Sequence, residues 1–223
     1  MRHKISPFFA VLIGLKATDI KSEHQIGWRD LMDRDIDRIF EFMLAANKTK
    51  QIKRTGWVRN NVKNPEHVGD HCFSTALLSY LMADYLKLDK NKCLLMGLTH
   101  DLNEVITGDI ASRATQKLQR ISNIEKMALE DRNTVKVLSA LPKRSRIEIL
   151  DAWRELSAGK TKEAKLVKQV DQLDYILLLM DYAKQFKNKK SIDEFFLVAG
   201  RRINAPELVH MYQKVRKALY KKQ

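Results

Sequence analysis

Apolar residues recur at three- and four-residue spacing through almost the whole chain after Asp33, as one face of an amphipathic helix requires. In segment 34–48, for example, the apolar face is made of Ile36, Ile39, Phe40, Met43 and Leu44. No run longer than a few residues alternates polar with apolar side chains, and 8 Gly and 4 Pro are too few for a turn-rich β protein. The pattern predicts an all-α fold.

Helix-breaking and capping residues divide this pattern into separate segments. Pro65 precedes an apolar stretch over 68–88, and Asp89 is an N-cap candidate for a helix that ends near residues 100–104. Further helical segments are expected over 119–141, 144–156 and 162–186, with a last helix that begins near Pro206. We predict one helical domain over residues 34–223 and an N-terminal arm over residues 1–33, whose role the sequence leaves open.

Two features bear on the compartment. The apolar run Phe8–Leu15 follows a basic start, as in a signal peptide, but it is far shorter than the ~20 residues of a membrane span. Cys72 and Cys93 both lie in apolar, helix-like runs, which predicts two buried thiols and a reducing compartment. We expect a cytoplasmic protein without a membrane partner.

The chain is strongly basic, with a formal charge of +14 that favours anionic partners such as nucleotides and phosphates. Part of this charge lies between Lys184 and Gln223, where 11 basic and 3 acidic residues give +8. One interpretation is a polyanion-binding surface; the other, which we favour, is a solvated helical face. Aromatic residues of this tail are spaced as core positions, so a nucleic-acid partner is not expected.

Residues that commonly bind metal ions are scattered over the predicted helices. They are His71, His100, Asp101, Glu104, Asp109 and Asp171. Glu104 lies three residues after Asp101 and four after His100, so a continuing helical turn would bring all three to one side. Two imidazoles and two carboxylates on facing helices suit a divalent transition ion and leave positions open for water and phosphate oxygen.

Each of these residues alone has an ordinary structural explanation. A lone histidine in an apolar helix is more often a hydrogen-bonded core residue, and Asp171 has Lys165 and Lys168 as candidate ion-pair partners. Burying so many polar side chains on apolar helices without a cation or a dense hydrogen-bond network is costly, however. We therefore predict a divalent metal site.

The order of these residues resembles the His…His-Asp…Asp signature of the HD-domain metal-dependent phosphohydrolases, in particular their 5'-deoxynucleotidase branch. The segments that carry the resemblance are Arg54–Trp57, Pro65–His71, His100–Glu104, Thr107–Ile110 and Glu163–Asp171. Together they extend over most of the predicted domain. The resemblance implies an all-α HD-domain bundle that removes phosphate from deoxyribonucleoside 5'-monophosphates.

The resemblance also implies a role for each matching residue. The implied metal ligands are His71, His100, Asp101 and Asp171. Glu104 would act as the acid–base residue that orients or deprotonates the attacking water. Arg54 and Trp57 would lie at the mouth, where Arg54 suits phosphate and the indole could bar a 2'-hydroxyl. Asp109 would contact substrate, and Glu104, Asp109 and the carbonyl of Ile110 are candidate contacts of a second metal ion.

Several alternatives stay open. The resemblance implies cobalt or manganese as the cation, and the ligand types also admit Mg, Fe, Ni or Zn. Family members commonly form dimers, which implies a homodimer. His67 stands where the family usually has a small polar residue, so it is either a competing ligand or a solvent-facing side chain. Other activities are hydrolysis of a nucleoside triphosphate, an alarmone or a cyclic nucleotide, or nucleic-acid binding with a vestigial metal site.

Overall fold

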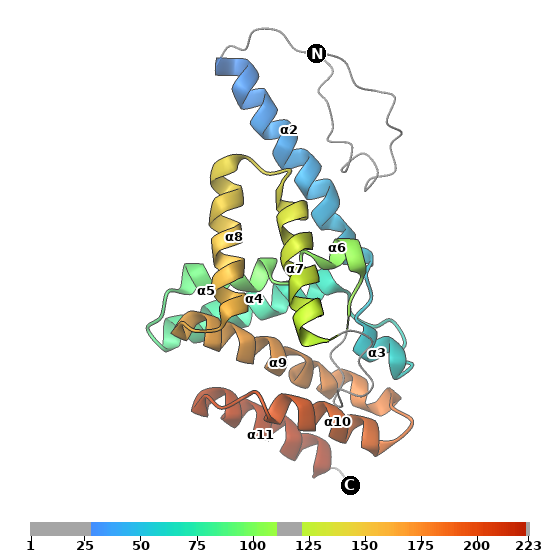
Figure 1. The fold of residues 1–223 in the computed structure, drawn as a ribbon. Coiled ribbons are helices and arrows are strands. Elements are labelled where there is room, and N and C mark those ends of the chain that lie inside the picture. The colour runs from blue at the N-terminus through green and yellow to red at the C-terminus, as the bar shows by residue number, and fades with distance from the viewer. Residues whose placement is uncertain (1–27, 111–121, 222–223) are drawn as a thin grey trace.

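A computed structural model describes residues 28–110 and 122–221, and over these residues the chain is helical without a β-strand (Figure 1). Its N-terminal helices are α2 (Trp28–Ala46), η1 (Asn47–Gln51), α3 (Thr55–Arg59), α4 (Val68–Tyr85), α5 (Lys90–Thr99) and α6 (Glu104–Thr107). The C-terminal helices are α7 (Asn123–Leu138), α8 (Lys143–Ala158), α9 (Lys162–Tyr182), η3 (Ala183–Gln185), α10 (Lys189–Gly200) and α11 (Pro206–Tyr220). The all-α prediction is confirmed.

Capping chemistry fixes the ends of these helices where the sequence predicts them. The Asp89 carboxylate accepts a hydrogen bond from the Lys92 amide at 3.0 Å and so begins α5. Gly159 ends α8 in the left-handed conformation, with φ 64°, and Pro206 occupies the first turn of α11. Two features differ from the prediction: the segment expected over 162–186 ends as an α-helix at Tyr182, and α10 was not among the expected helices.

Helix α9 is the centre of the fold. It contacts α4, α5 and α8 on one side and α10 and α11 on the other, an arrangement visible in Figure 1. Contacts on several sides explain why so much of α9 is apolar. Its fully buried or nearly buried apolar side chains are Leu166, Val167, Val170, Leu173, Ile176 and Leu179. A smaller core joins Phe42 and Ala45 of α2 to Val137 and Leu138 of α7.

Helix α4 buries mainly small side chains and exposes a stripe of large apolar ones. Ala76 and Ala83 are buried, while the stripe of Phe73, Leu77, Leu81 and Tyr85 is between 46% and 69% exposed. The short side chains allow close packing of the neighbouring helices, and the larger apolar residues are left on the opposite face. In the basic tail, Phe196 is buried against Tyr212 and Tyr220, with ring centroids 5.4 and 5.8 Å away, as the spacing of core positions predicts.

Most of the predicted N-terminal arm, including the apolar run Phe8–Leu15, lies outside the described residues. Helix α2 begins at Trp28, so residues 28–33 continue this helix. Within the described ranges, none of the helices combines the length and the apolar character needed to cross a bilayer.

Candidate metal centre and cavity

Three helices supply the predicted metal ligands. His71 lies in the first turn of α4, His100 and Asp101 follow the last residue of α5, and Asp171 lies in the middle of α9. His67, the N-cap of α4, lies in a reciprocal capping arrangement with Asp70, whose carboxylate accepts a hydrogen bond from the His67 amide at 2.8 Å. His67 is half-buried and is not among the side chains that converge with His71.

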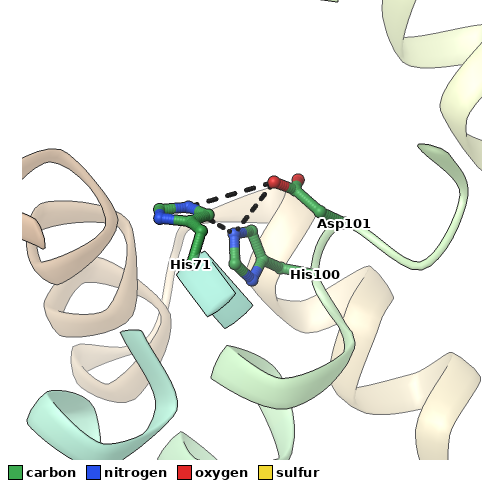
Figure 2. A group of neighbouring side chains, drawn as sticks. All are labelled: His71, His100 and Asp101. Atoms are coloured by element: carbon green, nitrogen blue, oxygen red, sulfur yellow. Dashed lines mark hydrogen bonds and ion pairs between the residues drawn. The ribbon is translucent and has the colours of Figure 1, made fainter. Parts of the chain in front are cut away.

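Gly97 allows the two histidine-bearing helices to approach each other closely. A Cβ atom at this position would lie 2.5 Å from Cα of Ala76, a distance that real side chains do not adopt. The contact lies between α4 and α5, close in the sequence to His100. With the helices so close, the Nε2 atoms of His71 and His100 are 3.2 Å apart (Figure 2).

The other ring nitrogen of each histidine already has an acceptor. Nδ1 of His71 is 2.7 Å from Oδ2 of Asp174, and Nδ1 of His100 is 2.8 Å from the carbonyl oxygen of Gly97. A proton on each Nδ1 satisfies these acceptors and leaves both Nε2 lone pairs directed at one point. Two nitrogen lone pairs this close are compensated by a cation or by a proton on one of them, so the pair of imidazoles suits a metal ion.

Two carboxylates complete this set. Oδ2 of Asp101 lies 3.3 Å from Nε2 of His100 and 3.9 Å from Nε2 of His71, and Figure 2 shows it facing both rings. Oδ1 of Asp171 lies 3.1 Å from Nε2 of His71. His71, His100 and Asp101 thus form one close group, and Asp171 approaches it through His71. Nitrogen and oxygen donors of these kinds are those that a divalent transition ion takes.

The carboxylates and the imidazole of this cluster each favour the charged form of the other. Burial opposes the charged form of His71, but its hydrogen bonds with Asp171 and Asp174 raise its pKa to about 9. Burial likewise opposes ionisation of Asp171, and the hydrogen bond with His71 still lowers its pKa to about 2. Both shifts show that the carboxylates of this pocket create a strong preference for positive charge.

Glu104 lies beside this cluster, and its carboxylate forms no ion pair with another described residue. It is 8% exposed, and within the described part of the chain its Oε2 atom has no hydrogen-bond partner. Burial, together with the negative charges of Asp101 and Asp109, raises its pKa well above the usual range. A buried carboxylate with a free oxygen and a raised pKa is the kind of group that serves in acid–base catalysis.

The cluster opens into a cavity of about 640 Å³. His100, Asp101, Glu104 and Asp171 line one part of it. Aromatic side chains, including Phe195 and Tyr175, line another, and the cationic residues on its wall are Arg54, Arg59, Lys126, Lys168 and Arg202. A space of this size with apolar walls and several cations suits an anionic small molecule.

Arg54 connects the metal cluster to Asp109. Its Nη1 atom is 3.1 Å from Oδ2 of Asp101 and 3.8 Å from Oδ1 of Asp109, and these carboxylates raise its pKa despite burial. Asp109 also accepts a hydrogen bond from the Thr55 amide, at 2.5 Å, and so caps α3. Both Arg54 and Asp109 line the cavity.

Trp57 lines the cavity but does not lie at an open mouth. It is 1% exposed, its indole nitrogen donates a hydrogen bond to Oε1 of Glu66 at 2.6 Å, and its ring stacks on Phe195 at 4.8 Å. The predicted position is therefore corrected: Trp57 forms an inner wall, because its large ring packs better in the core than at the rim.

Two predicted interactions involve lysines in an unexpected way. The carbonyl oxygen of Ile110, a candidate contact of a second metal ion, accepts a hydrogen bond from Nζ of Lys126 at 3.0 Å. Lys168, a candidate partner of Asp171, donates instead to the carbonyl oxygen of Ser157 at 2.8 Å. Both lysines line the cavity, so their ammonium groups add positive charge to its wall.

The sequence did not predict the residues that form hydrogen bonds with the candidate ligands and hold them in place. Asp174 binds His71, and Gln172 donates a hydrogen bond to Oδ2 of Asp171 at 2.7 Å. The spacing Asp171-x-x-Asp174 on an apolar helix is the signal that could have indicated Asp174, because residues three apart share a helix face. Gln172 carries no such signal.

Residues 46–209 match the family model of the HD domain. This chain is an HD-domain protein. The match contains the whole cluster of candidate ligands, so the family resemblance of the sequence is confirmed.

Relatives of this HD-domain protein are named 5'-deoxynucleotidase HDDC2. The protein of Xenopus laevis is 32% identical over 173 residues, which cover 78% of this chain and 83% of the relative. The protein of Dictyostelium discoideum is 34% identical over 166 residues, covering 70% of this chain and 85% of the relative. The chain therefore belongs to the branch of the HD-domain family that contains these 5'-deoxynucleotidases.

Two solved structures of similar fold come from Pyrococcus species. A conserved hypothetical protein from Pyrococcus furiosus is 29% identical and superimposes with a TM-score of 0.63, over 80% of this chain and 99% of its own. The PH0347 protein from Pyrococcus horikoshii is 28% identical with the same TM-score, over 79% of this chain and 97% of its own. The all-α HD-domain fold extends over most of the described chain.

Proposed function

We propose that this HD-domain protein is a metal-dependent 5'-deoxynucleotidase, which hydrolyses deoxyribonucleoside 5'-monophosphates to the nucleoside and phosphate. The observation that supports this most directly is the group of His71, His100 and Asp101, with Asp171 beside His71, next to a cavity lined by Glu104. One oxygen of Glu104 has no hydrogen-bond partner among the described residues. The names of its relatives supply the substrate class.

The four converging side chains would hold a divalent cation. When bound, this cation supplies positive charge that neutralises phosphoryl oxygens and makes water more acidic. Cobalt or manganese is our choice of metal, while Mg, Fe, Ni and Zn also suit two imidazoles and two carboxylates. Because Lys126 already donates to the carbonyl of Ile110, we favour one ion over two.

Glu104 would orient the attacking water or take its proton. Its position on the cavity wall, with Oε2 uncommitted among the described residues, leaves it free to do so. Burial and the negative charges of Asp101 and Asp109 raise its pKa, which makes Glu104 a stronger base than an ordinary carboxylate. Positioning and charge neutralisation dominate phosphoryl transfer, so few other protein groups are needed.

The cavity wall would bind the rest of the nucleotide. Arg54 suits the phosphate, since its guanidinium lies beside Asp101 and lines the cavity. Trp57, held by Glu66 and stacked on Phe195, presents a rigid edge against which a 2'-hydroxyl would collide. Asp109 would assist by fixing Arg54 and the start of α3.

Phosphate release from a panel of nucleotides tests this function. The protein is stripped with a chelator and reloaded with Mn, Co, Mg or Zn, then given deoxyribo- and ribonucleoside 5'-monophosphates. We expect metal-dependent release from the deoxynucleotides and slow release from the ribonucleotides. Nucleoside triphosphates, an alarmone and a cyclic nucleotide are tested in parallel. Hydrolysis of one of these without phosphate release from the monophosphates would contradict the proposal and identify another hydrolase activity.

We also propose a cytoplasmic homodimer. The buried, unpaired thiols of Cys72 and Cys93 agree with a reducing compartment. The exposed apolar stripe on α4, made of Phe73, Leu77, Leu81 and Tyr85, supports a contact with a second copy, because stripes of this kind are rarely left in water.

A further inference from the structure

Asp174, a second carboxylate on α9, contacts His71 of the metal cluster on the side of the ring away from His100. Asp174 lies one helical turn after Asp171 and is 7% exposed. Its Oδ2 atom is 2.7 Å from Nδ1 of His71, on the far side of the ring from the Nε2 atom that faces His100. Asp174 is absent from the residues that line the cavity, so substrate does not reach it.

The two histidines of the cluster are supported in different ways. His100 has a neutral acceptor, the carbonyl of Gly97, whereas His71 has a charged one. A carboxylate holds the Nδ1 proton more firmly than a carbonyl and makes the opposite nitrogen a better electron donor. His71 is also completely buried, so its ring has no alternative partner in water.

We propose that Asp174 is a positioning residue that fixes His71 with Nε2 toward the cation and thereby strengthens metal binding. This inference rests on the metal site of the proposed function. It explains why a carboxylate is buried here, since burying such a charge is unfavourable unless a positive or proton-donating partner compensates it. A metal-bound imidazole is such a partner.

Glu66 offers a competing explanation that the geometry disfavours. One ligand atom each from Glu66, His71 and Asp174 lie within 4.8 Å of one another, so the three could hold a cation of their own. However, Oε1 of Glu66 already accepts the indole proton of Trp57 at 2.6 Å. The distance of 2.7 Å between Asp174 and His71 is that of a hydrogen bond and leaves no room for an ion between them.

The test compares metal binding by wild type and Asp174→Asn. Affinities for Mn²⁺ and Co²⁺ are measured by competition with a fluorescent chelator, and bound metal is counted. We expect affinity to fall about 10- to 100-fold in the variant with unchanged stoichiometry. Asp174→Glu, which keeps the charge, should retain part of the affinity. Asp181→Asn, an exposed site on the same helix, is the matched control and should bind as wild type.

The outcomes separate this inference from the function on which it rests. Absence of metal binding by wild type overturns the metal site itself. Equal affinity in wild type and Asp174→Asn overturns the inference alone, even if the variant unfolds at lower temperature. Loss of one bound ion would make Asp174 a ligand and also overturn it. If Asp174→Asn does not fold, ¹⁵N-histidine NMR of the zinc-loaded wild type decides: we expect the His71 proton on Nδ1, and a proton on Nε2 would contradict the proposal.

Discussion

Glu104 is the residue whose chemistry can be separated most cleanly from metal binding. Glu104→Gln keeps the size of the side chain but cannot accept a proton, so we expect the metal to remain bound while turnover falls at least about 100-fold. Phosphate release and metal content are measured on the same preparation. Near wild-type turnover with metal present would exclude Glu104 as the acid–base residue.

Single residues also show which parts of the candidate site can be predicted from the sequence. His71, His100, Asp101 and Asp171 were predicted because their order matches a family signature, and the structure brings them together. Asp174 and Gln172 were not predicted. Their roles depend on which neighbour each buried polar atom meets, and that is set by the packing of α9 against α4.

At the scale of helices, the contact between α4 and α5 depends on Gly97. In Gly97→Ala the new methyl group would meet the α4 backbone, so the helices must separate, at a cost of about 1–3 kcal/mol of unfolding free energy. Separation would also move His100 away from His71 and weaken metal binding. Urea denaturation and metal titration measure the two effects.

Gly56→Ala is the matched control for this prediction. A Cβ atom at Gly56 would meet the ring of Phe195 at 3.7 Å, an ordinary contact, so stability should change little. Equal stability of Gly97→Ala and wild type would mean that the two helices do not need their close approach.

Helix ends were predictable where one residue type enforces them. Asp89, Gly159 and Pro206 each mark an observed boundary. Helix α10 was not predicted, because no proline or glycine separates it from α9 and its N-cap, Asn188, is a residue type that is also common in loops. Periodicity also cannot show that the α4 stripe faces outward, because it identifies a face of a helix but not what covers that face.

For the whole molecule, the candidate ligands tie together α4, the end of α5 and α9, the helices around which the main core is built. A cation that binds only the folded state should therefore stabilise it, by about 2.7 kcal/mol at a free concentration of 100 times Kd. We expect chelation to lower the melting temperature and metal addition to restore it. His71→Ala should abolish this response, and a response that persists would place the stabilising ion elsewhere.

Assembly is a second property at this scale. If the α4 stripe joins two copies, Leu81→Glu introduces two buried charges into the contact and should produce a monomer. Light scattering after gel filtration measures the mass. Ile124→Glu, at a position 81% exposed on α7, is the control and should leave the assembly intact. A wild-type monomer, or a dimer that tolerates Leu81→Glu, would rule out this interface.

The two buried tryptophans have a practical consequence. Trp153 donates its indole proton to the carbonyl oxygen of His100 at 3.2 Å, and Trp57 reaches the vicinity of His71 through Glu66. Each indole thus donates one hydrogen bond, either to a candidate ligand (His100) or to a residue close to one (Glu66). The molecule carries its own optical probes, so occupancy of the site can be followed by intrinsic emission without a label or a substrate.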